Sequence, residues 1–176
     1  MTTTEIIAQI FGILGLIVIV SSFQFKDNKT FFMLQGAGSL FFFVNFFMIG
    51  AFGGAFFNLT NLVRGLLFMK DREKKWKTIL IEVLYTGCFL FSVFLTKGDL
   101  RQMILAALPY VALLFMTVCM KKGNPTHIRV SQIAYMSPAW IIHNIFNFSL
   151  GGLVCEIINI ISSAIALMRY RKSDNQ

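Results

Sequence analysis

Residues 30–69 read TFFMLQGAGSLFFFVNFFMIGAFGGAFFNLTNLVRGLLFM and carry a single charged side chain, Arg64. Two small residues, Gly50 and Ala51, separate the two apolar halves of this stretch. A helix of about 20 mainly apolar residues is long enough to cross roughly 30 Å of hydrocarbon. The stretch therefore predicts two membrane-spanning helices joined by a tight turn.

The remainder of the chain has the same character. Of its 176 residues, 56% are hydrophobic and twenty are Phe, which leaves too little polar surface to cover a water-soluble globule of this size. We therefore predict an all-α integral membrane protein with seven transmembrane helices. The predicted spans are residues 5–25, 30–49, 51–69, 78–96, 103–120, 131–148 and 150–168.

Lys and Arg in the connecting loops predict the orientation of the chain. Basic residues accumulate on the inner side of a membrane protein, and an N-terminus on the outside leaves only Lys97 and Arg101 on the outer side. The C-terminus then lies inside, which makes this a multi-pass protein of the cell membrane. Because these loops account for the net charge of +8, no nucleic-acid partner is expected. The residues predicted inside are Lys26, Lys29, Lys70, Arg72, Lys74, Lys75, Lys77, Lys121, Lys122, Arg129, Arg169, Arg171 and Lys172.

The lengths of the connections predict an internal repeat. Two residues join spans two and three, two join spans six and seven, and a Gly pair follows each turn. An overlay of residues 35–69 on 133–167 pairs Asn61 with Asn159 and leaves the fourth span over. Two such units have the same orientation and are related by an axis along the membrane normal, as in transporters built from parallel repeats. The predicted parts are a three-helix bundle 5–69, a linker helix 78–96, a second three-helix bundle 103–168 and a cytoplasmic tail 169–176.

Asn61 and Asn159 lie at the middle of the third and seventh predicted spans, at equal depth. A carboxamide donates and accepts hydrogen bonds without carrying charge, which suits a hydroxyl-rich or amide-bearing solute near the midplane. The alternative is that each Asn bonds to another helix of its own bundle, which contributes about 0.6–2 kcal/mol. Because that alternative does not require matched depths, we expect both side chains to contact the solute.

Helical spacing extends each of these two faces. Asn58 precedes Asn61 by three residues, and Glu156 precedes Asn159 in the same way. Glu156 is predicted to couple transport to a proton or cation, or to contact a basic solute. The alternative is a hydrogen bond at an outer gate, to Asn58 or His143.

Further candidate solute contacts lie in the outer parts of the second and sixth spans. His143 either relays a proton with Glu156 or is a hydrogen-bonding group beside Asn144. Asn45 occupies the corresponding place in the second span. Trp140, about one turn deeper, either stacks on a ring-shaped solute or packs within the bundle.

Two prolines interrupt predicted spans. Pro109 in the fifth span and Pro138 in the sixth remove an intrahelical hydrogen bond and are predicted to act as hinges. Arg64 lies five residues from the inner end of its span and is predicted to extend toward the inner headgroups, with an inner gate as the alternative. Gln35 and Gln132 are expected to line an inner vestibule.

The helix plan, the outer N-terminus and the central Asn of spans three and seven resemble the SWEET/PQ-loop (MtN3-like) transporter superfamily. The stretch 22–26 (SFQFK) and the Asn61-x-x-Arg64 pattern are similar to those of the bacterial YgjV-type inner-membrane proteins. The resemblance implies that Asn61 and Asn159 contact the solute, a sugar in SWEET proteins.

The resemblance also implies that prolines act as hinges, and here the chain departs from the pattern. Pro109 and Pro138 match only two of the four hinge prolines of SWEET proteins, and no Pro-Gln dipeptide occurs. The Trp-rich motif of vitamin-precursor carriers in the same superfamily is absent from the sequence.

The predicted function is a facilitator-type carrier for a polar, neutral or weakly charged metabolite, such as a sugar or a vitamin-like compound. It needs no cofactor or metal, and a monomer suffices, with a homo-oligomer left open. The alternative is a non-transporting membrane protein that binds a partner protein or lipid through the Phe-rich stretch 41–47 and the basic loop 70–77. An enzyme is not expected, because no His/Asp/Glu cluster, nucleophile–base spacing or phosphate-binding Gly loop occurs.

Overall fold

A computed structural model describes residues 2–22, 28–70, 73–122 and 124–173. Two of the predicted inner basic residues, Lys26 and Arg72, lie outside the described residues, as does most of the stretch 22–26. The described residues are helical, apart from short connections. The elements are α1 (Thr3–Ser22), α2 (Asn28–Met48), α3 (Phe52–Phe68), α4 (Lys75–Leu95), α5 (Leu100–Lys122), α6 (Pro125–Ser131), the π-helix η1 (Gln132–Met136), α7 (Ser137–Phe146) and α8 (Leu150–Ser173).

The prediction of an all-helical membrane protein is confirmed. The elements α6, η1 and α7 follow one another without a break, so the described residues form seven helical segments. Four of these, α1, α4, α5 and α8, are long and apolar enough to cross a bilayer, and the shorter apolar helix Met33–Met48 lies within α2.

Two helical segments extend beyond their predicted spans. The sixth helical segment begins at Pro125 and not at residue 131, because Asn124 caps it: its side-chain oxygen accepts hydrogen bonds from the amides of Thr126 (2.9 Å) and His127 (3.2 Å). The predicted seventh span, 150–168, coincides with the apolar part of α8, Leu150–Met168, and the helix continues to Ser173 within the predicted tail 169–176.

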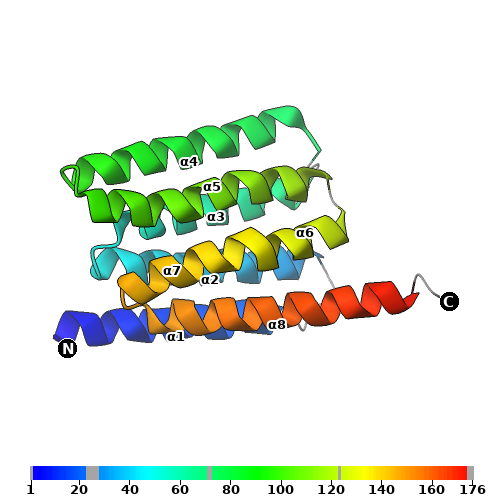
Figure 1. Ribbon diagram of the computed structural model, residues 1–176, viewed down its shortest axis with the longest axis horizontal. Helices are drawn as coiled ribbons and strands as arrows, with labels where there is room; N and C mark the ends of the chain where they lie inside the picture. Colours follow the sequence, from blue (N-terminus) through cyan, green and yellow to red (C-terminus); the bar gives the residue numbers. More distant parts are fainter. Residues whose placement is uncertain (1, 23–27, 71–72, 123, 174–176) are drawn as a thin grey trace.

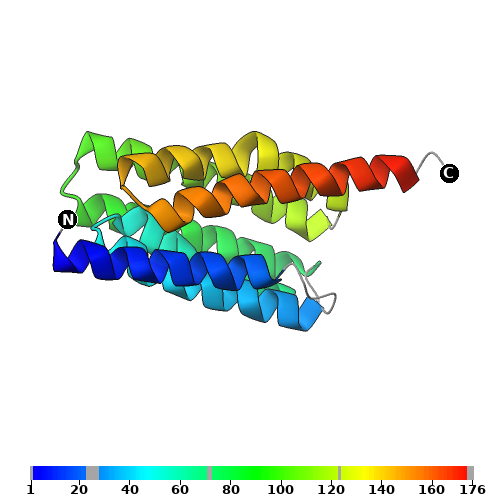
Figure 2. The ribbon, with the colours of Figure 1, turned by 90° about the horizontal axis from the view of Figure 1, so that it is seen from below.

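The helices run side by side along the long axis of the molecule (Figure 1). One end of the bundle carries the N-terminus and the turns α2–α3, α4–α5 and α7–α8, and the other carries the remaining connections and the C-terminus (Figure 2). We call the latter the basic end. Lys70 and Lys74 lie in its loops, and Lys121 and Lys122 form the end of α5 there.

Helix contacts close a ring. In chain order α1, α2, α3, α5, the α6–η1–α7 segment and α8 each pack against the next, and α8 packs back against α1. The remaining helix, α4, packs against α3 and α5 at the edge of the bundle (Figure 1). Large apolar side chains such as Val83 and Phe94 of α4 point away from the protein, which is the arrangement expected where hydrocarbon is the solvent.

The ring is closed at two places by small residues. A Cβ atom built on Gly151 of α8 would lie 2.3 Å from the carbonyl carbon of Gly12 in α1. A Cβ atom on Gly53 of α3 would lie 2.7 Å from the Cβ of Ala106 in α5. Helices in membranes approach closely where side chains are small, so these contacts set the spacing of α8–α1 and α3–α5.

Lys77 joins α3 to α4. Although it is a cation at the start of α4, only 7% of its surface is exposed. Its ammonium donates to the carbonyl of Leu67 (2.8 Å) and to that of Lys70. These carbonyls belong to the C-terminal end of α3, where a positive charge also interacts favourably with the helix dipole. Lys77 therefore caps α3, a role that its place in the basic loop did not predict.

Replacing Lys77 with Met should lower the thermal unfolding midpoint of the purified protein. The substitution removes hydrogen bonds to a charged donor, whose loss costs about 1.5–3 kcal/mol. Lys75→Met is the matched control, because Lys75 is exposed and bonds to no carbonyl among the described residues. Equal midpoints for the two variants would contradict the capping role.

Replacing Gly151 with Leu should also lower the unfolding midpoint, because the new side chain forces α8 away from the backbone of α1. Overpacking of this kind typically costs about 1–3 kcal/mol. Gly87→Leu is the control, since a Cβ atom at Gly87 meets nothing within 4 Å. A Gly151→Leu variant as stable as Gly87→Leu would show that the α1–α8 contact does not hold the ring closed.

Candidate functional site

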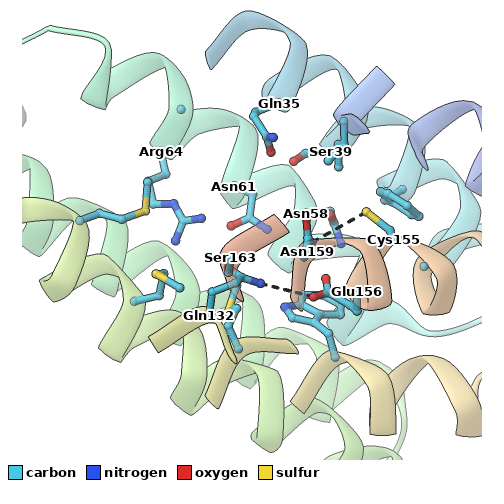
Figure 3. Close-up of a pocket in the computed structure, with 18 of the residues that line it drawn as sticks. Gln35, Ser39, Asn58, Asn61, Arg64, Gln132, Cys155, Glu156, Asn159 and Ser163 are labelled. Atoms are coloured by element: carbon cyan, nitrogen blue, oxygen red, sulfur yellow. Dashed lines mark hydrogen bonds between the residues drawn. The ribbon is translucent and has the colours of Figure 1, made fainter. Parts of the chain in front are cut away.

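The ring encloses a cavity of about 360 Å³. Its lining extends to Ile128 and Arg129 at the basic end and stops at Phe46, Trp140 and Gly152 toward the opposite end. Polar side chains from α2, α3, η1 and α8 converge on it (Figure 3). The polar and charged lining residues are Gln35, Ser39, Asn58, Asn61, Arg64, Arg129, Gln132, Asn144, Glu156, Asn159 and Ser163.

Asn61 and Asn159 both line this cavity. The side-chain oxygen of Asn61 accepts a hydrogen bond from the Tyr85 hydroxyl (2.6 Å), which fixes the carboxamide and leaves its NH2 group for the cavity. The Asn159 NH2 group contacts the Cys155 sulfur at 3.9 Å. Sulfur is a weak acceptor, so both carboxamides retain hydrogen-bonding capacity.

Three more polar side chains on the cavity wall have unused oxygen atoms. Asn58 donates its NH2 group to the carbonyl of Gly54 (2.9 Å), which leaves its side-chain oxygen free to accept. The side-chain oxygens of Asn144 and Ser163 are buried and have no hydrogen-bond partner among the described residues. Unpaired buried polar atoms are costly, so these oxygens have hydrogen-bonding capacity left for water or another partner.

Glu156 lies on the wall formed by α8 and is held from the η1–α7 junction. Its Oε2 atom accepts hydrogen bonds from the Ser137 hydroxyl (2.7 Å) and the Gln132 side-chain amide (3.4 Å). The Gln132 amide also donates to the Ser137 hydroxyl (2.9 Å). The hydrogen bonds predicted as an alternative, to Asn58 or His143, are absent among these contacts, because the junction brings Ser137 and Gln132 closer.

Arg64 faces the cavity instead of extending toward the headgroups (Figure 3). Its guanidinium donates to the Thr117 hydroxyl (3.4 Å) and lies over the Tyr85 ring, 5.9 Å from the centroid. No carboxylate among the described residues forms an ion pair with it. The prediction that Arg64 snorkels to the inner headgroups is therefore wrong, because Tyr85 and Thr117 hold the guanidinium inward.

Three aromatic rings close the cavity at the end away from the basic residues. Trp140 stacks on Phe46 with ring centroids 5.7 Å apart. His143 meets both rings edge-on, at 5.1 Å from Phe46 and 5.2 Å from Trp140. Trp140 is part of the lining, whereas His143 lies behind it and against Gly54. Trp140 therefore lines the cavity, and His143 lies behind the lining.

Asn45 was expected beside the solute but lies outside the cavity lining. Its NH2 group donates to the carbonyl of Ala8 (2.7 Å), and its side-chain oxygen accepts from the Ser149 hydroxyl (2.7 Å). The residue is fully buried and packs against Gly12. Asn45 therefore joins α1, α2 and the α7–α8 turn and has no group left for a solute.

The two predicted hinge prolines lie in different surroundings. Pro109 is buried within the unbroken helix α5. Pro138 is the second residue of α7, separated from the end of η1 by one residue. Proline lacks the amide that would continue the hydrogen-bond ladder, and a π-helical turn accommodates such a gap. The wider turn carries Gln132 and Met136 to the cavity wall.

Sequence reasoning missed the contribution of Tyr85 and Thr117, which orient Asn61 and Arg64. Both lie in apolar runs, and only their contact with a predicted site residue distinguishes them from packing residues. Arg129 was assigned to an inner loop, but the early start of α6 places it on the cavity wall.

The sequence profile of the bacterial inner membrane protein family Imp-YgjV matches residues 6–174. The chain belongs to this family. An Imp-YgjV protein is an inner-membrane protein, which agrees with the apolar helices of this structure. No curated protein and no solved structure matches the chain. Membership in Imp-YgjV confirms the narrower of the two expected resemblances, and the link to the SWEET/PQ-loop superfamily stays a prediction.

Proposed function

We propose that this Imp-YgjV protein is a carrier that moves a small polar solute across the inner membrane by alternating access. The observation that carries the proposal is the cavity lined by Asn61 and Asn159, with unpaired oxygens on its wall. A cavity of 360 Å³ is within the usual size range of small-molecule sites, about 300–1,000 Å³. Polar groups at membrane depth are costly and mark solute pathways.

The arrangement we propose is two three-helix units joined by α4 as a linker. Helix contacts support it, because exchanging α1 with α5, α2 with α7 and α3 with α8 converts each ring contact into another observed contact. In particular, α3–α5 becomes α8–α1. The small-residue contacts obey the same exchange, since Gly53 and Gly151 are equivalent in the predicted repeat and face Ala106 and Gly12.

The two small-residue seams also indicate how the closed end opens. Gly151 lies against the backbone of Gly12, so small residues form this part of the seam. The Gln9 side chain of α1 hydrogen-bonds across the same seam to the Phe148 carbonyl and the Leu150 amide, and these bonds would break when the seam opens. Rocking one three-helix unit against the other would part the seams and separate the rings of Phe46 and Trp140. The gap in the backbone ladder at Pro138 permits the bending that such a motion requires.

We further propose that the cavity in this conformation faces the cytoplasm. The basic end carries most of the Lys and Arg residues of the described loops, whereas Lys97 and Arg101 lie at the opposite end. Basic loops remain on the inner side of bacterial membranes, so the basic end is cytoplasmic.

Single cysteines introduced at the two ends test this orientation in a background without Cys88, Cys119 and Cys155. In intact spheroplasts a membrane-impermeant maleimide should modify Lys97→Cys, and it should modify Lys121→Cys only after lysis. The reverse pattern would overturn the orientation.

Alternating access is tested by a single cysteine at Ser39, a cavity-lining residue of α2, in the same cysteine-free background. A small, membrane-impermeant methanethiosulfonate reagent with a fixed charge should modify Ser39→Cys from the basic end and, more slowly, from the opposite end, which is closed in this conformation. Right-side-out and inside-out vesicles separate the two directions.

Ser92→Cys is the matched control, because Ser92 of α4 is buried outside the cavity and should react from neither side. Modification of Ser39→Cys from the basic end alone would mean that the cavity is a dead end. That outcome would contradict the carrier and favour a membrane protein that binds a partner or lipid.

A further inference from the structure

A basic and an acidic side chain line the cavity from different helices, with carboxamides between them. Arg64 of α3 and Glu156 of α8 both line the cavity, and Asn58, Asn61 and Asn159 lie between them (Figure 3). The two charged groups form no ion pair with each other. Asn58, the predicted equivalent of Glu156, is six residues from Arg64, which corresponds to about 9 Å along the helix axis.

Neither charge has an oppositely charged partner among the described residues. The guanidinium has five N–H donors, yet its hydrogen bond here is the 3.4 Å contact with Thr117. The Glu156 carboxylate accepts two bonds from neutral donors, Ser137 and Gln132, and both reach the same oxygen. These donors fix the carboxyl group, and neither of them brings a positive charge to it.

We propose that the transported solute is a zwitterion, an inference that rests on the proposed carrier function. Its anionic group pairs with Arg64, and its ammonium group pairs with Glu156. A planar guanidinium binds a carboxylate through two parallel hydrogen bonds, which fixes both the position and the orientation of that end. Such a solute gives each of the two groups the oppositely charged partner that it lacks among the described residues, and charged groups at membrane depth usually have such partners.

The residues between the charges fit the middle of such a solute. Tyr85 holds the Asn61 oxygen, so the NH2 group of Asn61 is presented to the cavity as a donor. The free side-chain oxygen of Asn58 supplies an acceptor. These groups recognise a polar, uncharged segment such as an amide or a hydroxyl-bearing chain.

The test uses a matched set of six-carbon probes with the purified protein in a neutral detergent. They are 6-aminohexanoate, hexanoate, hexylamine and hexane-1,6-diol at equal concentrations. A ligand that binds only the folded protein raises the unfolding midpoint by mass action. We expect 6-aminohexanoate to raise it more than any other probe of the set.

Variants assign the effect to the two charges. Arg64→Gln and Glu156→Gln should each abolish the shift produced by 6-aminohexanoate, whereas Arg64→Lys, which keeps the charge, should retain part of it. Matched controls outside the cavity are Arg101→Gln and Glu82→Gln, which should retain the full shift. Retention of the shift in a folded Arg64→Gln or Glu156→Gln variant would overturn the proposal.

Other outcomes also decide the question. Equal shifts with hexanoate and 6-aminohexanoate would indicate a site for anions and overturn the zwitterion. A shift with the diol alone would indicate a neutral solute and overturn it too. So would the absence of a shift with every ω-amino acid from glycine to 8-aminooctanoate. None of these results tests the proposed carrier function, which is tested separately by the modification of Ser39→Cys from the two sides of the membrane.

Discussion

The architecture depends on one constraint: inside a bilayer, a polar group has no water to bond with. Backbone groups meet this constraint by forming helices, and polar side chains meet it by turning toward the protein interior. Apolar side chains such as Val83 and Phe94 are left facing outward, where they meet hydrocarbon. The ring of helices and its polar interior are therefore two results of the same requirement.

Asn45 and Asn61 show how the same chemical group acquires different roles. Each hydrogen-bonding group of Asn45 has a protein partner, and the side chain ties α1 and α2 to the α7–α8 turn. Asn61 has only one group occupied, by the Tyr85 hydroxyl. The difference lies in the neighbours and not in the residue type. A carboxamide that is half satisfied at the wall of a cavity is the kind of group that supports binding.

The edge helix α4 contributes no residue to the cavity lining but organises it. The Arg64 guanidinium lies over the Tyr85 ring, and the Tyr85 hydroxyl donates a hydrogen bond to the side-chain oxygen of Asn61. Tyr85 therefore orients two cavity residues of α3. Lys77, in the first turn of the same helix, caps the C-terminal end of α3. Helix α4, placed against α3 and α5, thus holds α3 in position, while small residues bring α3 close to α5 and α8 close to α1.

The sequence by itself determined the helical membrane class, the approximate helices and two facing rows of polar residues. These follow from run length and helical spacing, which are local properties. Helical spacing predicts the faces Gly54, Asn58, Asn61, Gly65 and Gly152, Glu156, Asn159, Ser163, and all of these residues except Gly54 line the cavity. Only the tertiary structure decided which polar groups are already paired. Asn45 is hydrogen-bonded to Ala8 and Ser149. Glu156 is hydrogen-bonded to Ser137 and Gln132. Arg64 is hydrogen-bonded to Thr117 and lies over the Tyr85 ring. Most of these partners lie on other helices, and hydrogen bonds between helices depend on packing that no local pattern of apolar residues encodes.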